Sequence, residues 1–199
     1  MKVTVFAPFV PKEITNVITI ESDDYVIAVD GAFDELIKQK IKIDLVVGDL
    51  DSIKDQRKLK SYEVKKLNTV KDTTDTFEAI KIAYQKSNNV FLIGGIKGNR
   101  IEHLLANLTL FETANNLIIK DENSQIYRLN SGKHLIKKGG YISFFTFGKA
   151  IITLEGFKYP LTDYVLKAND PLCISNEIEK LYGEVIIKEG SLLVIETKK

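Results

Sequence analysis

The sequence predicts an α/β N-terminal domain with a mostly parallel sheet flanked by helices over residues 1–122, followed by a smaller all-β sandwich over residues 123–199. Short β-branched runs alternate with helical periods as far as Lys120, which is typical of a layered α/β fold. After the polar stretch 121–124 no long helical period follows, and the apolar runs have the length of strands. We therefore expect the domain boundary within this stretch.

The strands expected in the first domain are apolar without strict alternation. This pattern is typical of parallel strands that helices cover on both faces. The expected strands are residues 2–6, 25–29, 45–47, 64–67, 90–93 and 117–119.

Two amphipathic helices are expected between these strands, because apolar residues recur at helical spacing. Asp75 with Glu78 and Asn99 with Glu102 read as capping boxes, and Ser52 with Asp55 is a weaker start signal. The apolar stripes comprise Phe77, Ile80, Ala83 and Tyr84 in one helix, and Ile101, Leu104, Leu105, Leu108 and Phe111 in the other.

The second domain is expected to be built from antiparallel strands. Residues 141–147 and 150–154 are strand-like, and the pair 185–187 and 192–195 flanks a turn at Glu189-Gly190. A β domain of this size buries a low fraction of its surface, so we expect it to pack on the first domain or on a second copy of the chain.

Composition restricts the classes of partner. Lys and Arg number 28 against 27 Asp and Glu, so the formal charge of +1 argues against binding to nucleic acid or an anionic membrane. The lone Cys173 forms no intramolecular disulfide and is expected to be structural, as in a reducing compartment. No apolar stretch approaches the ~20 residues that cross a bilayer, and a cytoplasmic protein is expected.

Acidic turns follow several of the expected strands. Asp30 follows residues 25–29, Asp49 and Asp51 follow residues 45–47, and Asp72 and Asp75 follow residues 64–70. The carboxyl ends of parallel strands meet at one sheet edge, where gathered carboxylates repel one another unless a cation lies between them. Without a Cys or His cluster, the pattern favours Mg²⁺ carrying phosphates. The alternative is that these residues cap helices or turns. Asp30 is also a candidate to accept hydrogen bonds from a ribose.

A glycine-rich loop precedes the second helix. Gly94 and Gly95 follow a strand, and backbone N–H groups at the helix start are suited to phosphate oxygens. The spacing matches neither the Walker A nor the G-x-G-x-x-G motif. Arg100 is a candidate phosphate clamp or a solvated side chain, and His103 is a candidate ligand-facing residue or a structural histidine.

The motifs at 48–52, 71–76, 94–103, 156–161 and 174–177 together resemble the thiamine pyrophosphokinase family over nearly the whole chain. The resemblance implies an ATP:thiamine diphosphotransferase that forms AMP and thiamine diphosphate with Mg²⁺. It also implies a homodimer with the site between subunits, an ATP-binding first domain and a thiamine-binding second domain.

The resemblance also implies roles for individual residues. Asp49, Asp51 and Asp72 serve Mg²⁺ and the phosphates, and Thr74 and Asp75 lie near the transferred group or the substrate. Arg100, Glu102 and His103 line the nucleotide side, and Ser175 and Asn176 meet thiamine. Asp30, Gly94 and Gly95 are added to the nucleotide side from the interpretation of the residues themselves.

The chain departs from the family pattern at three places. Bacterial relatives usually have glycine at Asn99 and aspartate at Glu102, and the first strand ends in Ala7-Pro8 in place of a glycine pair. Because the chain lacks Trp, aromatic support for the heterocycles must come from Tyr or Phe, and the sequence does not choose which. Two rival functions remain: another Mg²⁺-dependent nucleotide phosphotransferase, and a non-catalytic sensor of nucleotide or thiamine diphosphate.

Overall fold

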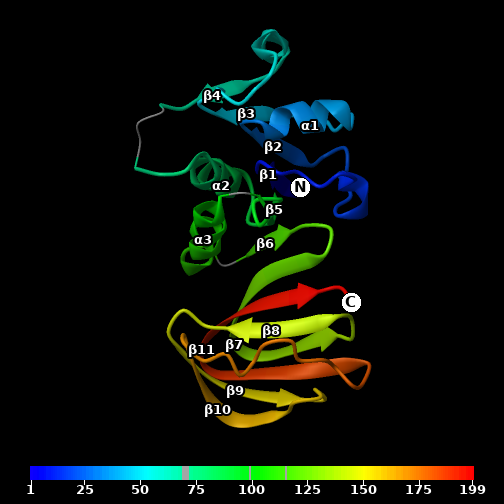
Figure 1. Cartoon of the computed structure of the whole chain (residues 1–199), viewed down its shortest axis with the longest axis vertical. Coiled ribbons are helices and arrows are strands. Elements are labelled where there is room, and N and C mark those ends of the chain that lie inside the picture. The colour runs from blue at the N-terminus through cyan, green and yellow to red at the C-terminus, as the bar shows by residue number, and fades with distance from the viewer. Residues whose placement is uncertain (69–71, 99, 115) are drawn as a thin grey trace. The chain divides into compact units, whose positions relative to one another are not determined.

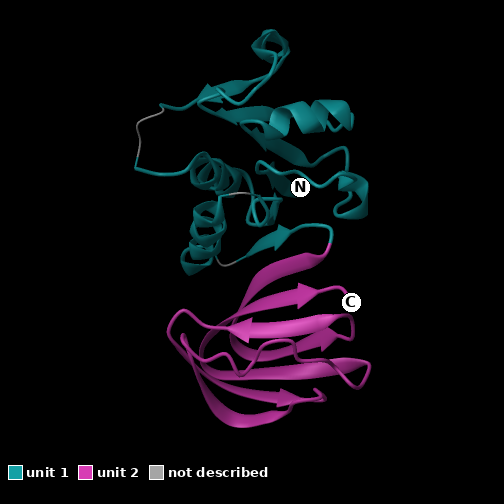
Figure 2. Cartoon of the chain, in the orientation of Figure 1, with its two compact units in different colours: residues 1–122 teal, residues 123–199 magenta. Residues whose placement is uncertain are grey.

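A computed structural model describes residues 1–68, 72–98, 100–114 and 116–199 (Figure 1). The chain divides into two compact units, unit 1 (Met1–Glu122) and unit 2 (Asn123–Lys199), as coloured in Figure 2. None of the described helices is both long and apolar enough to cross a membrane.

Unit 1 is built on a parallel sheet, as predicted. Its strand order is β4-β3-β2-β1-β5-β6, and neighbouring strands in this order pair in parallel. Each expected strand is confirmed to within one residue at either end. The strands are β1 (Val3–Phe6), β2 (Tyr25–Val29), β3 (Leu45–Gly48), β4 (Val64–Lys66), β5 (Val90–Ile93) and β6 (Leu117–Lys120).

Helices lie on both faces of this sheet. Figure 1 shows α1 (Ala32–Lys38) on one side of the strands, with α2 (Asp75–Lys86) and α3 (Ile101–Thr109) on the other. Three short 3-10 turns complete the described helical structure: η1 (Ile14–Asn16), η2 (Gln56–Ser61) and η3 (Leu110–Glu112). Buried side chains of α1 pack with β1, β2 and β3 in one apolar cluster.

The helix starts differ from the predicted capping boxes. Thr74 caps α2, because its hydroxyl accepts the N–H of Phe77 at 3.1 Å, and Glu78 instead accepts from the Thr73 hydroxyl at 2.9 Å. The pairing of Asp75 with Glu78 was therefore wrong. Asp55, and not Ser52, caps η2. In the predicted box of Asn99 with Glu102, Asn99 lies outside the described residues.

The apolar stripe of α3 is only partly buried. Phe111, in η3, is fully buried, whereas Ile101 is 70% exposed and Leu105 is 59% exposed. Part of the predicted apolar stripe therefore lies at the surface of unit 1.

Unit 2 consists of antiparallel strands, with no helix among its residues. β11 (Tyr182–Thr197) is central, and β7 (Ser124–Lys137) pairs along one of its edges. On the other edge, β9 (Lys149–Glu155) pairs with the first half of β11, and β8 (Tyr141–Phe145) pairs with the second. β10 (Leu161–Lys167) pairs with β9.

The predicted turn at Glu189-Gly190 is a bend inside one long strand. The register of β11 shifts between Ile187 and Ser191, and Gly190 has a left-handed φ of 83°. A Cβ at Gly190 would lie 2.2 Å from the carbonyl oxygen of Lys149, so the bend needs glycine. The expected hairpin of residues 185–187 and 192–195 was therefore wrong.

The core of unit 2 contains the single cysteine. Cys173 is buried in a cluster with Phe144, Phe157 and Val194. Burial, with a smaller contribution from the charge of Asp170, raises the pKa of the Cys173 thiol to about 11. The thiol is therefore protonated and unreactive at neutral pH, as expected of a structural cysteine.

Candidate active site

Four carboxylates gather at the carboxyl edge of the sheet in unit 1. Asp30 follows β2, Asp49 and Asp51 follow β3, and Asp75 is the first residue of α2. The Asp30 carboxylate accepts the N–H of Leu50 at 3.3 Å, which joins the end of β2 to the turn after β3. Asp49 accepts the N–H of Asp51 at 3.2 Å within that turn.

A glycine makes the approach of Asp30 to this turn sterically allowed. A Cβ at Gly48 would lie only 1.7 Å from Oδ1 of Asp30, and the φ of Gly48 is 150°. Any other residue at the end of β3 would displace the Asp30 carboxylate or the turn that it holds.

The carboxylates of this acidic edge raise one another's pKa values. Burial raises the pKa of Asp30 to about 6, and the charges of Asp75, Asp49 and Asp51 act in the same direction. The pKa of Asp51 is also raised, first by its hydrogen bond with the Asp49 carboxyl and then by the Asp49 charge. The carboxylates therefore repel one another, and hard oxygen donors in this state suit Mg²⁺.

No contact in the described structure joins Asp72 to these four carboxylates. Among the described residues, no group of three or more His, Cys, Asp or Glu side chains could hold a metal ion by itself. Asp72 is exposed and directly follows residues 69–71, which lie outside the described residues. The predicted ligand set of Asp49, Asp51 and Asp72 is therefore not assembled.

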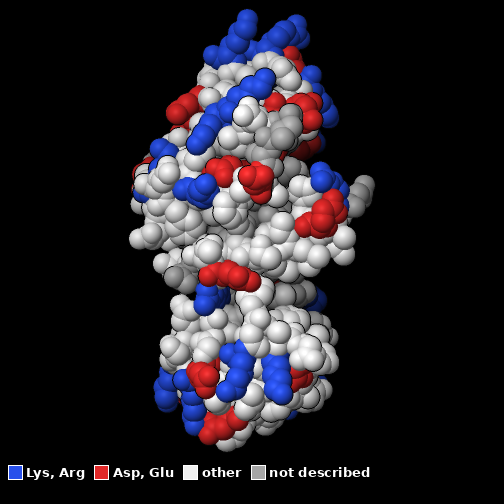
Figure 3. Space-filling model, turned by 90° about the vertical axis from the view of Figure 1, so that its left-hand side faces the viewer, with Lys and Arg blue, Asp and Glu red and all other residues white. Residues whose placement is uncertain are grey.

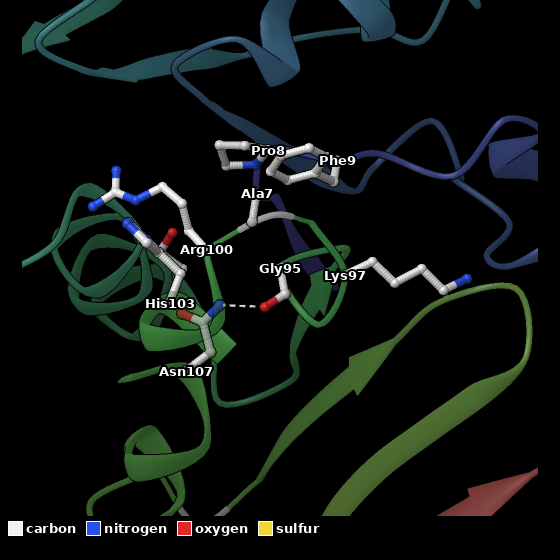
Figure 4. Close-up of a pocket in the computed structure, with 9 residues that line it drawn as sticks. Ala7, Pro8, Phe9, Gly95, Lys97, Arg100, His103 and Asn107 are labelled. Atoms are coloured by element: carbon white, nitrogen blue, oxygen red, sulfur yellow. Dashed lines mark hydrogen bonds between the residues drawn. The ribbon is translucent and has the colours of Figure 1, made fainter. Parts of the chain in front are cut away.

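A pocket of about 100 Å³ lies beside the glycine-rich loop (Figure 4). It brings together three residues predicted on the nucleotide side: Gly95, Arg100 and His103. The full lining is Ala7, Pro8, Phe9, Thr76, Gly95, Lys97, Arg100, His103 and Asn107.

A buried amide fixes the loop that forms one wall of this pocket. The Nδ2 group of Asn107 in α3 donates to the carbonyl oxygen of Gly95 at 2.8 Å, drawn as a dashed line in Figure 4. Gly95 has a left-handed φ of 72°, and a Cβ there would lie 2.6 Å from Asn107 Nδ2. Gly94 lies outside the lining, but its close approach to the carbonyl of Phe9 also needs a small residue.

Three salt bridges restrain Arg100 and Lys97, the two basic side chains of the pocket. Arg100 Nε donates to Glu102 at 2.7 Å, and this hydrogen bond lowers the pKa of the Glu102 carboxyl. Lys97 pairs with Glu122 at 2.8 Å and with Asp121 at 3.0 Å. Glu102 is exposed and does not line the pocket, so in this structure it acts on the pocket through Arg100.

In unit 2, Ser175 and Asn176 lie in contrasting environments. Asn176 is buried, and its amide oxygen accepts the N–H groups of Tyr159 at 3.1 Å and Glu177 at 2.8 Å. Its amide nitrogen donates to the carbonyl of Tyr159 at 2.8 Å. Ser175 is exposed and has a left-handed φ of 58°, a conformation that non-glycine residues seldom adopt.

Comparison with known proteins matches both units to one family. The model of the thiamin pyrophosphokinase catalytic domain matches residues 18–122, and that of the thiamin pyrophosphokinase vitamin B1 binding domain matches residues 126–192. The chain belongs to the thiamine pyrophosphokinase family. The thiamine pyrophosphokinase of Bacillus subtilis is 33% identical over 163 residues, which cover 75% of this chain and 76% of that protein.

Solved thiamine pyrophosphokinases share the fold. The crystal structure of the Bacillus subtilis enzyme aligns over 100% of both chains with a TM-score of 0.85 and 24% identity. A family member from Enterococcus faecalis aligns over 100% of both chains with a TM-score of 0.84 and 25% identity. As a thiamine pyrophosphokinase, the chain is an enzyme that catalyses the ATP-dependent diphosphorylation of thiamine.

Several lining residues of the thiamine pyrophosphokinase pocket were not predicted from the sequence. Asn107 lies one helical turn after His103, so helical spacing from the predicted residue could have found it. Thr76 directly follows Asp75, so its place in the acidic motif was the signal for it. The segment Ala7–Pro8–Phe9 carried no signal, because it departs from the family's glycine pair.

Proposed function

We propose that unit 1 binds ATP with Mg²⁺ and that unit 2, with its strands closed into the predicted sandwich, binds thiamine. The observation that carries the proposal is the gathering of Asp30, Asp49, Asp51 and Asp75 at the sheet edge that also bears the pocket. An acidic edge beside a cationic pocket suits a metal-bound polyphosphate, and it also attracts the positively charged thiazolium of thiamine.

Asp49 and Asp51 would hold the Mg²⁺ ion, with Asp72 as a further predicted ligand. Mg²⁺ commonly takes one or two protein carboxylates and completes its shell with water and substrate phosphates, so a full protein cage is not required. When bound, the ion neutralises polyphosphate charge and aligns the phosphates for in-line displacement. Asp30 supports this arrangement by holding the turn that carries Asp49 and Asp51.

The phosphates of ATP would contact Arg100, His103 and the backbone around Gly94 and Gly95. Arg100 presents a planar set of donors that matches phosphate oxygens. Thr74 and Asp75 stand at the start of α2, near the transferred diphosphate. One of the gathered carboxylates would accept the proton that leaves the thiamine hydroxyl as its oxygen attacks phosphorus.

On the thiamine side, we assign the contact to Ser175 and a supporting role to Asn176. The Asn176 amide makes three hydrogen bonds inside unit 2 and holds the neighbouring turn. Ser175 is exposed next to it. The exposed serine is therefore the better candidate for direct contact with the substrate.

The family resemblance also implies a homodimer with the site between subunits. The exposure of Ile101 and Leu105 on α3 supports an apolar contact with a second copy. A cytoplasmic location stays a prediction from the sequence.

The decisive experiment is a product assay. The protein is incubated with ATP, Mg²⁺ and thiamine, and the nucleotides are separated by chromatography. We expect AMP and thiamine diphosphate in equal amounts, and no turnover after chelation of Mg²⁺ with EDTA. Release of ADP would indicate transfer of a single phosphoryl group, and a ligand-induced thermal shift without turnover would indicate a sensor.

A further inference from the structure

Phe9 is an aromatic side chain held in an unusual position. It is 57% exposed, although large aromatic rings contribute most when they are buried. Its φ is 65°, in the left-handed region that non-glycine residues seldom adopt. An exposed ring held in a strained backbone conformation points to a use other than core packing.

The neighbouring loop is shaped around this ring. A Cβ at Gly98 would lie 2.5 Å from Cε2 of Phe9, so the ring packs directly on the Gly98 backbone. Gly98 itself has a φ of 120°. The two loops are therefore fitted to each other, and Figure 4 shows the Phe9 ring beside Pro8 at the edge of the pocket.

The charges of the pocket indicate which heterocycle this ring would meet. Arg100 and His103 line the pocket, whereas the ammonium of the third basic lining residue, Lys97, pairs with Asp121 and Glu122. None of the described lining residues is acidic, so the cationic thiazolium of thiamine would find no carboxylate among them. A polyanionic nucleotide would have its phosphates near cations and its base near apolar atoms.

We infer that Phe9, with Pro8 beside it, forms a stacking platform for the adenine base of ATP and contributes to selection of a base-bearing substrate. This inference rests on the proposed function, because it needs ATP to occupy the pocket of unit 1. Phe9 lies before residue 18, where the match to the family's catalytic domain begins, and it directly follows Ala7-Pro8, which stand in place of the family's glycine pair.

The test compares two ligands that share phosphates but differ in the base. Binding of ATP and of inorganic tripolyphosphate, each with Mg²⁺, is measured by calorimetry on the whole protein and its variants. Phe9→Asn removes the ring but keeps a residue that tolerates the left-handed conformation. Phe9→Tyr keeps the ring. Phe147→Asn removes another exposed ring, in unit 2, as the matched control.

We expect Phe9→Asn to weaken ATP binding about 10-fold, the size of one base–aromatic stack, while tripolyphosphate binding stays unchanged. Phe9→Tyr and Phe147→Asn should retain the ATP affinity of the unmodified protein. The KM for ATP should rise with the loss of the ring, and the KM for thiamine should not.

Other results would overturn the inference in distinguishable ways. If Phe9→Asn binds ATP and tripolyphosphate more weakly by the same factor, Phe9 only shapes the loop. A higher KM for thiamine alone would mean that the ring contacts thiamine. If the unmodified protein binds ATP no better than tripolyphosphate, no platform exists, whether or not Phe9→Asn folds. Absence of both ATP binding and AMP release would instead overturn the proposed function.

Discussion

Gly48 illustrates how a missing side chain can place a carboxylate. Its Cα faces the Asp30 carboxylate so closely that a methyl group would lie 1.7 Å from Oδ1. Asp30 in turn holds the N–H of Leu50, which fixes the turn bearing Asp49 and Asp51. The position of the acidic edge therefore depends on a residue that has no polar side chain.

We predict that Gly48→Ala lowers turnover about 100-fold, because the displaced Asp30 no longer orients the turn. It should also lower the free energy of unfolding by about 1–3 kcal/mol, from steric overlap and backbone strain. Steady-state kinetics and urea unfolding measure the two effects. Gly148→Ala is the control, since no described atom lies within 4 Å of its added Cβ, and unchanged turnover in Gly48→Ala would contradict the proposed site.

Asp49 and Asp72 can be separated by mutation. Asp49 belongs to the gathered carboxylates, whereas Asp72 joins them only by prediction from the family motif. We predict that Asp49→Asn and Asp72→Asn each reduce turnover by several orders of magnitude without unfolding the protein. Turnover is titrated with Mg²⁺ for each variant. Normal turnover and normal Mg²⁺ dependence in Asp72→Asn would remove Asp72 from the site.

At the scale of an element, the turn around Ser175 depends on its buried neighbour. Asn176→Ala would leave the N–H and carbonyl of Tyr159 without their present partner. We predict a loss of about 2 kcal/mol or more in unfolding free energy, typical of buried groups left unsatisfied. Ser175→Ala should keep full stability and raise the KM for thiamine more than that for ATP. Equal rises for the two substrates would contradict a thiamine-side role.

The start of β1 is joined to the start of β2 by a buried carboxylate. Asp24 accepts the N–H of Glu21 at 2.8 Å and the N–H of Lys2 at 3.0 Å, and it pairs with the Lys2 ammonium at 2.9 Å. Burial alone would raise the pKa of Asp24, but the hydrogen bonds from Glu21 and Lys2 outweigh it and the pKa is lowered.

Because the folded state lowers the pKa of Asp24, the ionised carboxylate stabilises the fold above the unfolded value of about 3.9. This contribution is lost as the pH falls through the folded pKa. We predict that Asp24→Asn costs about 1–3 kcal/mol at pH 7, and that the difference from the unmodified protein narrows below about pH 4. Urea unfolding across this pH range measures it, and a constant difference at all pH values would contradict the assignment.

The elements show which features sequence patterns can specify. Strands such as Tyr25–Val29 were predicted because a short apolar run suffices to identify them. The bend at Gly190 was predicted as a hairpin turn, because glycine permits a left-handed φ both in a turn and in a bend within a strand. Only the pairing of β11 with β7 and β9 distinguishes the two structures. Four of the five predicted acidic residues gather because parallel strands end at one edge. The position of the Phe9 ring at the pocket depends on a left-handed backbone conformation that no local sequence pattern encodes.

At the scale of the whole molecule, charge is balanced and dispersed. On the face shown in Figure 3, Lys and Arg are interspersed with Asp and Glu over the surface of each unit. The formal charge of +1 agrees with this distribution. Recognition of an anionic substrate must therefore come from local groups such as Arg100, and not from a field of the whole chain.

Exposed apolar residues on α3 lead to a prediction about assembly. Ile101 and Leu105 lie one helical turn apart and are 70% and 59% exposed, and Ile101 directly follows the pocket residue Arg100. An apolar contact with a second copy at this helix would bring a partner subunit close to the pocket, and this proximity would link activity to assembly.

We predict that the unmodified protein sediments as a dimer and that Leu105→Asp sediments as a monomer with reduced turnover, because a charge on α3 would have to be buried in the contact. Leu135→Asp, at an apolar residue of β7 that is 70% exposed, is the control and should remain dimeric. Sedimentation velocity and turnover are measured at the same protein concentration. A dimeric and fully active Leu105→Asp would separate α3 from the subunit contact, and a monomeric but active protein would place every group needed for transfer within one chain.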